Sequence, residues 1–369
     1  MNDGALGLKL NRKRFMIFII RFITSFCLYT LITQANVWLT PSDNTLLVFG
    51  SRFFMVGTPL LLFVFKQRSL SLSLFLATIG IGLLFFSNPY LRLFAIVLIS
   101  GGISIAGYLI RFEAAETPSG ASYNKIAVNA GSIMSGLWLL ILMKDQSLFI
   151  NISIILLGTM ALLAARKKRK ESLIINNKLT SNPRVILGWA FLSIAIGIKM
   201  YSLFSLLPQY LLSHFRALPS WYGSMLTVNG LVIIFLQIPI MKLITKSTKN
   251  NRPLKITFII MGLGMLLLTS LSLPIFTSFT SILLWVVLLS LVECAVSYLD
   301  VEGVKMKSLF IKELFIGAGG GICVLCSRLF SAHIASLATG CLGILAMIIA
   351  ILFLFPLLKN SSALNVRGH

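Results

Sequence analysis

The chain has 369 residues, of which 57% are hydrophobic and only 11% are charged, and its mean hydropathy is +0.94. Soluble domains carry about 25% charged residues, so this composition excludes an ordinary soluble fold and indicates a polytopic membrane protein. A net charge of +22 would suit nucleic-acid binding. The basic residues lie between hydrophobic segments, however, so we expect no nucleic-acid partner.

Twelve segments approach the length of about 20 mostly apolar residues that a membrane-spanning helix needs. Met1 to Arg14 followed by Phe15 resembles a secretory signal, but no small-residue cleavage site follows, so we expect a retained first span. Short turns such as residues 87–89 predict that consecutive helices are antiparallel neighbours. The predicted spans are 15–37, 45–65, 70–87, 92–110, 123–143, 147–165, 185–208, 221–241, 255–273, 279–299, 311–333 and 336–358.

Residues 166–184, between the sixth and seventh predicted spans, are basic, rich in Asn and without apolar periodicity. Such a segment cannot bury itself in a core, so we expect a solvated cytoplasmic linker. The predicted organisation is therefore an N-terminal six-helix bundle at 1–165, the linker at 166–184, and a C-terminal six-helix bundle with a short cytoplasmic tail at 185–369.

The basic residues also predict the orientation, because cytoplasmic loops carry an excess of Lys and Arg. With the N-terminus inside, the inner segments hold 25 of the 32 Lys and Arg residues and the outer loops hold three. We therefore expect both termini to be cytoplasmic, in a cell inner (plasma) membrane. The partners of the inner loops would be anionic lipid headgroups.

The two halves of the chain show an internal repeat. Pro59 and Pro239 each come late in the second predicted helix of their half, and both are followed by a basic loop. Gly80 and Gly82 then match Gly262 and Gly264 at nearly the same offset. A duplicated six-helix unit predicts a cavity between the halves, near the midplane of the bilayer.

Several short motifs fit this layout. Residues 207–211 (LPQYL) close the seventh helix, Asn229 and residues 237–239 lie in the eighth, and residues 111–136 read as an inner loop followed by a glycine-bearing fifth helix. With these features the chain resembles the major facilitator superfamily across its whole length. The resemblance implies an all-α fold of 12 transmembrane helices in two pseudo-symmetric bundles, and secondary transport by alternating access.

Two features depart from the family's pattern. The loop at 61–71 has Lys66 and Arg68 but neither the Gly nor the Asp that the family usually carries there. The fourth helix, at 95–109, lacks the internal Arg and Gln of proton-coupled drug exporters. These departures count against a multidrug/proton antiporter and leave the fold assignment intact.

Four basic side chains lie within predicted spans, where a central charge costs roughly 2.5 to 3.5 kcal/mol. Lys199 is about fifteen residues into the seventh helix, which favours a cavity-lining or coupling role over a structural ion pair. Arg52 either lines the cavity or reaches the outer surface. Arg21 lies near the cytoplasmic end, which favours reaching the headgroups, although a cavity position stays open. For Arg328 the two interpretations are equal.

Glu293 is the one acid that clearly lies within a predicted span, and it is a candidate for proton coupling, with a structural ion pair as the alternative. Asp300 follows at the cytoplasmic mouth and is a gating candidate. Arg111, Glu113 and Glu116 form either a gating cluster or a solvated loop face. Gln34, Asn36, Tyr201, Gln209 and Asn229 could orient a ligand, although hydrogen bonding between helices is the commoner use.

Other motifs carry no chemistry. Residues 317–321 (GAGGG) lack the Lys and Ser/Thr of a phosphate-binding loop, so they favour close helix packing. Cys323 and Cys326 favour core packing, and the five cysteines imply no disulfide framework. The three histidines give little support to a metal site. We expect that the protein binds no cofactor and is not an enzyme.

We expect a monomeric transporter of a small organic solute. Because cationic side chains within the spans outnumber acidic ones, we expect this solute to be anionic or zwitterionic. Within the same fold, the alternatives are a drug or metabolite exporter working by proton antiport, and a lipid or lysolipid flippase. An alternative of another class is a transport-inactive sensor or scaffold.

Overall fold

The computed structural model describes residues 12–38, 41–65, 68–142, 145–166, 182–215, 219, 221–246, 256, 259–260, 262–264 and 278–366. Throughout these residues the chain is helical and forms no strand, which confirms the all-α prediction. In the described part of the chain, eight helical segments are long and apolar enough to cross a membrane, and two further apolar segments are shorter. The protein is therefore a multi-pass membrane protein.

Eleven of the twelve predicted spans coincide with described helices. The ninth, at 255–273, and the linker at 166–184 lie mostly outside the described residues. The first half contains α1 (Arg12–Trp38), α2 (Pro41–Phe53), the 3-10 helix η1 (Phe54–Gly57), α3 (Thr58–Phe65), α4 (Ser69–Leu83), α5 (Pro89–Ala114), α6 (Pro118–Leu142) and α7 (Gln146–Ala165). The second half contains α9 (Pro183–Ser202), α10 (Leu206–Phe215), α11 (Tyr222–Lys246), α13 (Phe279–Val296), α14 (Tyr298–Lys305), α15 (Leu309–Leu329) and α16 (Ala332–Val366).

An Asn-Pro pair starts one helix in each half. Asn88 accepts a hydrogen bond from the backbone N–H of Tyr90 at 2.9 Å, and Pro89 occupies the first turn of α5. Asn182 accepts one from Arg184 at 3.0 Å, and Pro183 begins α9. Proline tolerates this position because the first-turn N–H has no intrahelical partner. Each pair therefore sets the start of a long helix.

Three predicted spans are interrupted, where α2 passes into η1, α9 into α10 and α13 into α14. Polar side chains donate to carbonyl groups at these breaks. The acceptors are Arg52 (from Ser104 Oγ, 3.1 Å), Leu203 (from Tyr222 Oη, 3.0 Å) and Cys294 (from Gln237 Nε2, 3.3 Å). Interrupted backbone at membrane depth needs such partners, so the breaks are stabilised from neighbouring helices.

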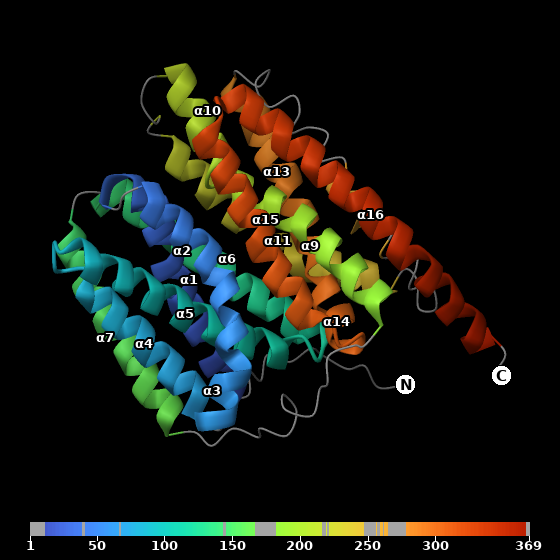
Figure 1. The fold of residues 1–369 in the computed structure, drawn as a ribbon, viewed down its shortest axis with the longest axis horizontal. Coiled ribbons are helices and arrows are strands. Elements are labelled where there is room, and N and C mark those ends of the chain that lie inside the picture. Colours follow the sequence, from blue (N-terminus) through green and yellow to red (C-terminus); the bar gives the residue numbers. More distant parts are fainter. Residues whose placement is uncertain are drawn as a thin grey trace.

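Helices α1–α7 gather on one side of the molecule and α9–α16 on the other (Figure 1). Two main contacts join the sides, α2 with α15 and α6 with α11. In the predicted repeat, the second span (α2) is equivalent to the eighth (α11), and the fifth (α6) to the eleventh (α15). Exchanging the two halves therefore converts the contact of α2 with α15 into the contact of α11 with α6. The domain limits at 1–165 and 185–369 remain a prediction.

Glycines let α15 approach its neighbours closely. A Cβ on Gly319 would collide with the carbonyl of Ile194 in α9, and a Cβ on Gly197 would collide with the carbonyl of Ile316. On another face, a Cβ on Gly317 would collide with the Arg52 side chain of α2. The predicted packing role of residues 317–321 is confirmed, and Cys323 and Cys326 are buried in the same helix, as expected.

One predicted loop is wrong. We expected the fourth span to end at residue 110 and Arg111 to lie in a cytoplasmic loop, but α5 continues to Ala114, so Arg111 lies within the helix. The count of basic residues on the inner side includes Lys125 and Lys312, although they fall at the starts of the predicted spans 123–143 and 311–333. They lie in α6 and α15, and Lys312 is only 1% exposed. Hydropathy ends a predicted span at its first charged residue. The helix itself continues past that residue when the charged side chain has a partner inside the protein.

Candidate functional site

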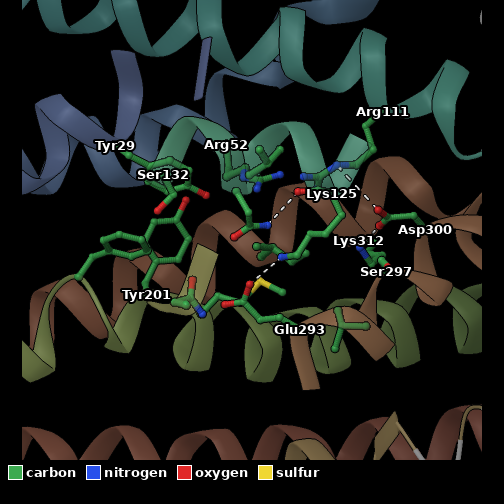
Figure 2. Close-up of a pocket in the computed structure, with 17 residues that line it drawn as sticks. Tyr29, Arg52, Arg111, Lys125, Ser132, Tyr201, Glu293, Ser297, Asp300 and Lys312 are labelled. Carbon is green, nitrogen blue, oxygen red and sulfur yellow. Dashed lines mark hydrogen bonds and ion pairs between the residues drawn. The ribbon is translucent and has the colours of Figure 1, made fainter. Parts of the chain in front are cut away.

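A small cavity lies between the two sides of the molecule (Figure 2), and its volume is about 50 Å³. This volume holds a few water molecules, whereas ligand pockets measure roughly 300 to 1,000 Å³. We call this conformation closed, because its central cavity is too small to hold an organic solute. The charged and aromatic residues lining the cavity are Tyr29, Arg52, Arg111, Lys125, Tyr201, Phe204, Glu293, Asp300 and Lys312.

Glu313, in the first turns of α15, is the centre of the ionic contacts beside this cavity, and it is 1% exposed. The guanidinium groups of Arg52 and Arg111 both contact Oε2 of Glu313. Lys312 Nζ lies 3.2 Å from the other oxygen, Oε1. Since Arg52 ends α2 and Arg111 ends α5, this carboxylate ties two helices of the first half to α15.

Asp300 in α14 extends the cluster (Figure 2). Lys312 Nζ lies 2.5 Å from its Oδ1, and Arg111 Nε lies 4.0 Å from its Oδ2. Buried ions of this kind persist only with good partners. Arg111 therefore bridges two carboxylates from the second half, close to where α14 leads into α15.

Lys125 and Glu293 form a separate ion pair across the cavity (Figure 2). Lys125 Nζ, from α6, lies 2.7 Å from Oε2 of Glu293 in α13, and both side chains are largely buried. The structural alternative for Glu293 is thus realised in this conformation, while its coupling role remains a proposal.

Arg21 in α1 lies beside a second, smaller cavity of about 30 Å³, which Arg52, Tyr29, Tyr201 and Glu313 also line. Arg21 is 7% exposed, and its Nε has no hydrogen-bond partner among the described residues. Its guanidinium occupies the space that a side chain at Gly107 would fill. The favoured expectation that Arg21 reaches the headgroups is wrong, because this face of α1 packs inside the protein.

Tyr201 and Asn229 lie at the cavity between the two halves, as predicted for residues that could orient a ligand. Tyr201 lines both cavities, and its hydroxyl lies 3.4 Å from Ser51 Oγ. Asn229 lines the larger cavity and donates a 2.9 Å hydrogen bond to Ser290 Oγ, which joins α11 to α13. Gln34 and Asn36 belong to α1, but their side chains lie outside the described residues.

Lys199 lies elsewhere than expected. It is 1% exposed, and its Nζ lies 4.4 Å from the centre of the Trp285 ring of α13. It lines neither the central cavity nor the smaller cavity beside Arg21. Lys199 is buried, as its position within the span predicted, but it lies on a face of α9 that does not line these cavities.

The predicted gating residues are only partly brought together. In the described part of the chain, Arg111 forms its ion pairs with Glu313 and Asp300 rather than with Glu113 and Glu116. Glu116 is exposed and Glu113 is half-buried. The structure thus brings Arg111 and Asp300 together, because the side chain of Arg111 turns across the interface. The exposed Glu116 fits the alternative of a solvated loop face, and the gating role of these residues remains a prediction.

The sequence missed Glu313, Lys312 and Lys125 as site residues. The expectation that Glu293 is the only acid within a span is wrong, since Glu313 is fully buried. For Lys312 and Glu313 the available signal was an adjacent Lys-Glu pair at the start of a glycine-rich helix. Within the described ranges no three His, Cys, Asp or Glu side chains gather at a metal-binding distance, so we assign no residue to a metal or cofactor.

Three features define the fold class of the protein: the paired contacts between its two sides, the interrupted helices and the charged central cavity. The chain has the major facilitator fold expected from the sequence, and its solved structural neighbours are membrane transporters. No protein-family model matches the chain. No curated protein matches it in sequence.

Solved structures show the likeness in detail. The POT family transporter PepTSo is 14% identical, with a TM-score of 0.69 over 96% of this chain and 98% of that one. A POT family transporter in complex with 5-aminolevulinic acid is 13% identical, with a TM-score of 0.63 over 93% and 96%. The human organic anion transporter MFSD10 (TETRAN) is 12% identical, with a TM-score of 0.59 over 91% and 98%.

Proposed function

We propose that the protein is a secondary active transporter, and not an enzyme, that moves a small anionic or zwitterionic organic solute by alternating access. The observation that carries this proposal is the central cavity, where cations from the first half meet carboxylates from the second. Neighbours with the same fold are described in complex with a thioalcohol conjugated peptide and with 5-aminolevulinic acid, and as an organic anion transporter. All three descriptions fit a cargo with an acidic group.

The ionic contacts act as a closing device in this mechanism. An apolar cluster of Phe112, Ala115 and Leu309 lies where α5 ends and α15 begins, and Tyr108 meets Phe310 there at 5.5 Å between ring centres. Opening this end separates Arg52 and Arg111 from Glu313. Removing one partner from a buried pair costs about 3 to 5 kcal/mol, so the bound cargo must offset part of that cost.

The proposed topology follows the distribution of basic residues. Both termini and the linker at 166–184 face the cytoplasm, and the two bundles at 1–165 and 185–369 rock about the central cavity of a monomer in the inner membrane. The basic loops contact anionic headgroups. In this orientation the closed end with Phe112 and Leu309 faces inward.

Glu293 is the proposed proton-coupling group. Its carboxylate faces the cavity and pairs with Lys125, so protonation would release the pair and loosen the contact between α6 and α13. The variant Glu293→Gln is expected to lose the pH dependence of transport in proteoliposomes. A pH profile identical to that of the wild type would reject this role.

Transport is tested with purified protein in proteoliposomes, incubated with a cell extract and assayed by mass spectrometry of the trapped solutes. The wild type is expected to accumulate a subset of acidic metabolites, and Arg52→Gln to lose this accumulation. Arg68→Gln is the matched control, because Arg68 is exposed. Accumulation of cationic solutes only would reject the charge assignment, and no flux of any solute would favour a sensor or scaffold.

A further inference from the structure

The residues beside the two cavities differ in charge according to the half they come from. The first half supplies four cations, Arg21, Arg52, Arg111 and Lys125, and no acid of that half lines either cavity. The second half supplies three carboxylates, with Lys312 as its single cation: Glu293, Asp300 and Glu313. Five positive charges thus face three negative charges in the closed conformation.

The excess of positive charge is concentrated around Arg52. Arg52 and Arg111 share one oxygen of Glu313, and Lys312 holds the other. Glu293 is occupied by Lys125. Among the described residues, Arg21 forms no ion pair, and its Nε is buried without a hydrogen-bond partner. A buried guanidinium without an ion-pair partner is costly, so additional negative charge beside Arg21 would be stabilising.

Separation of the two halves would increase the excess of positive over negative charge in the cavity. When the halves separate, Arg52 and Arg111 lose Glu313, and all four cations of the first half face one open cavity. The two cavities share Tyr29, Arg52 and Tyr201 in their walls, so a ligand at their junction can reach both Arg21 and the Arg52–Arg111 region.

We infer that the cargo is a dianionic organic solute, such as a dicarboxylate or a phosphate monoester, which binds to Arg21, Arg52 and Arg111 of the first half. This inference rests on the proposed transport function and narrows it. A zwitterion fits less well, because each carboxylate beside the cavities already contacts at least one cation of the protein. An ammonium group would therefore add positive charge where positive charge is already in excess.

The test measures binding without transport. Purified full-length protein in detergent is heated with succinate, glutarate, adipate or glycerol 3-phosphate, and with butyrate, dialanine and 5-aminolevulinic acid at matched ionic strength. At least one dianion is expected to raise the Tm at a concentration ten-fold below any monoanion or zwitterion. The dicarboxylates and the phosphate ester separate the two sources of a dianion.

Three variants locate the site. Arg21→Gln is expected to weaken dianion binding at least ten-fold and to abolish the preference for dianions over butyrate, while Arg21→Lys keeps that preference. Arg68→Gln should match the wild type. Arg21→Gln removes an uncompensated charge, so it should fold; if it does not, Arg52→Gln must show the same loss of preference. Unchanged dianion binding in the folded variant, or stronger binding of a zwitterion, would overturn the inference.

The two proposals can fail separately. Dianion binding without flux in proteoliposomes would reject transport and keep the site. Flux of a zwitterion by a protein that no dianion stabilises would reject the dianion inference and keep transport.

Discussion

Glu313 is the side chain on which the closed conformation depends most, because three cations contact its two oxygens. Glu313→Gln should lower the free energy of unfolding by about 3 to 5 kcal/mol, since it leaves buried cations without their shared partner. Chemical denaturation in detergent measures this change. Glu116→Gln is the control, as Glu116 is exposed; equal stability of the two variants would show that the cluster does not stabilise this state.

Lys199 should behave differently from the residues at the cavity. Lys199→Met keeps the length of the side chain and removes a contact with Trp285 that is worth roughly 0.5 to 2 kcal/mol. We expect a change of that size in stability and no change in the apparent affinity for cargo, measured by uptake at varied solute concentration. A ten-fold loss of affinity at wild-type stability would return Lys199 to the binding site.

Single charged residues within spans were predictable from hydropathy, but their partners were not. Lys199 and Tyr201 are two positions apart on α9, so they point to different neighbours; one faces Trp285 and the other the cavities. Depth along a helix follows from counting residues, whereas the face depends on which helices pack around it. The same limit explains Arg21, which turns inward.

At the scale of elements, the contact between α15 and α9 depends on the absence of side chains at two glycines. Gly319→Ala should destabilise the protein by about 1 to 3 kcal/mol, because the added methyl meets the backbone carbonyl of Ile194, which cannot rotate away. Thermal unfolding measures the loss. Gly158→Ala is the control, since its nearest neighbour would lie at an ordinary 3.7 Å; an equal effect at both positions would contradict this account.

The positions of the helices were largely predictable, and their interruptions were not. Predicted spans such as 147–165 and 279–299 agree closely with α7 and α13. The breaks after α2 and α9 lie inside segments that are apolar enough to read as single spans, although polar residues such as Arg52 and Ser202 stand beside them. They depend on side chains from other helices, such as Tyr222, which donates to Leu203.

At the scale of the whole molecule, the contact of α6 with α11 offers a direct test of movement. A Cβ at Gly136 would lie 3.7 Å from the Cβ of Leu226, a separation that suits a disulfide, although the Thr227 hydroxyl at 2.8 Å would have to rotate away. In a Cys341→Ser background, oxidised Gly136→Cys/Leu226→Cys should lose transport and recover it on reduction. Each single variant is a control, and full activity of the cross-linked protein would show that these helices need not separate.

The global layout was predictable because a duplicated unit with strong hydropathy restricts the possible folds. The sequence could not reveal the cross-half ion pairs, since Arg52 and Glu313 are 261 residues apart and no local pattern links them. Which end of the cavity is closed depends on these contacts and on the apolar cluster at Phe112, and is therefore a property of the folded molecule.

The sharing of Glu313 between Arg52 and Arg111 also has a genetic consequence. A cell that depends on the protein and carries Glu313→Gln should regain growth through second-site suppressors that remove a positive charge. Such suppressors should fall at Arg52 or Arg111, encoded more than two hundred codons upstream. Selection of revertants would thus map the interface in living cells without a purified protein or a known cargo.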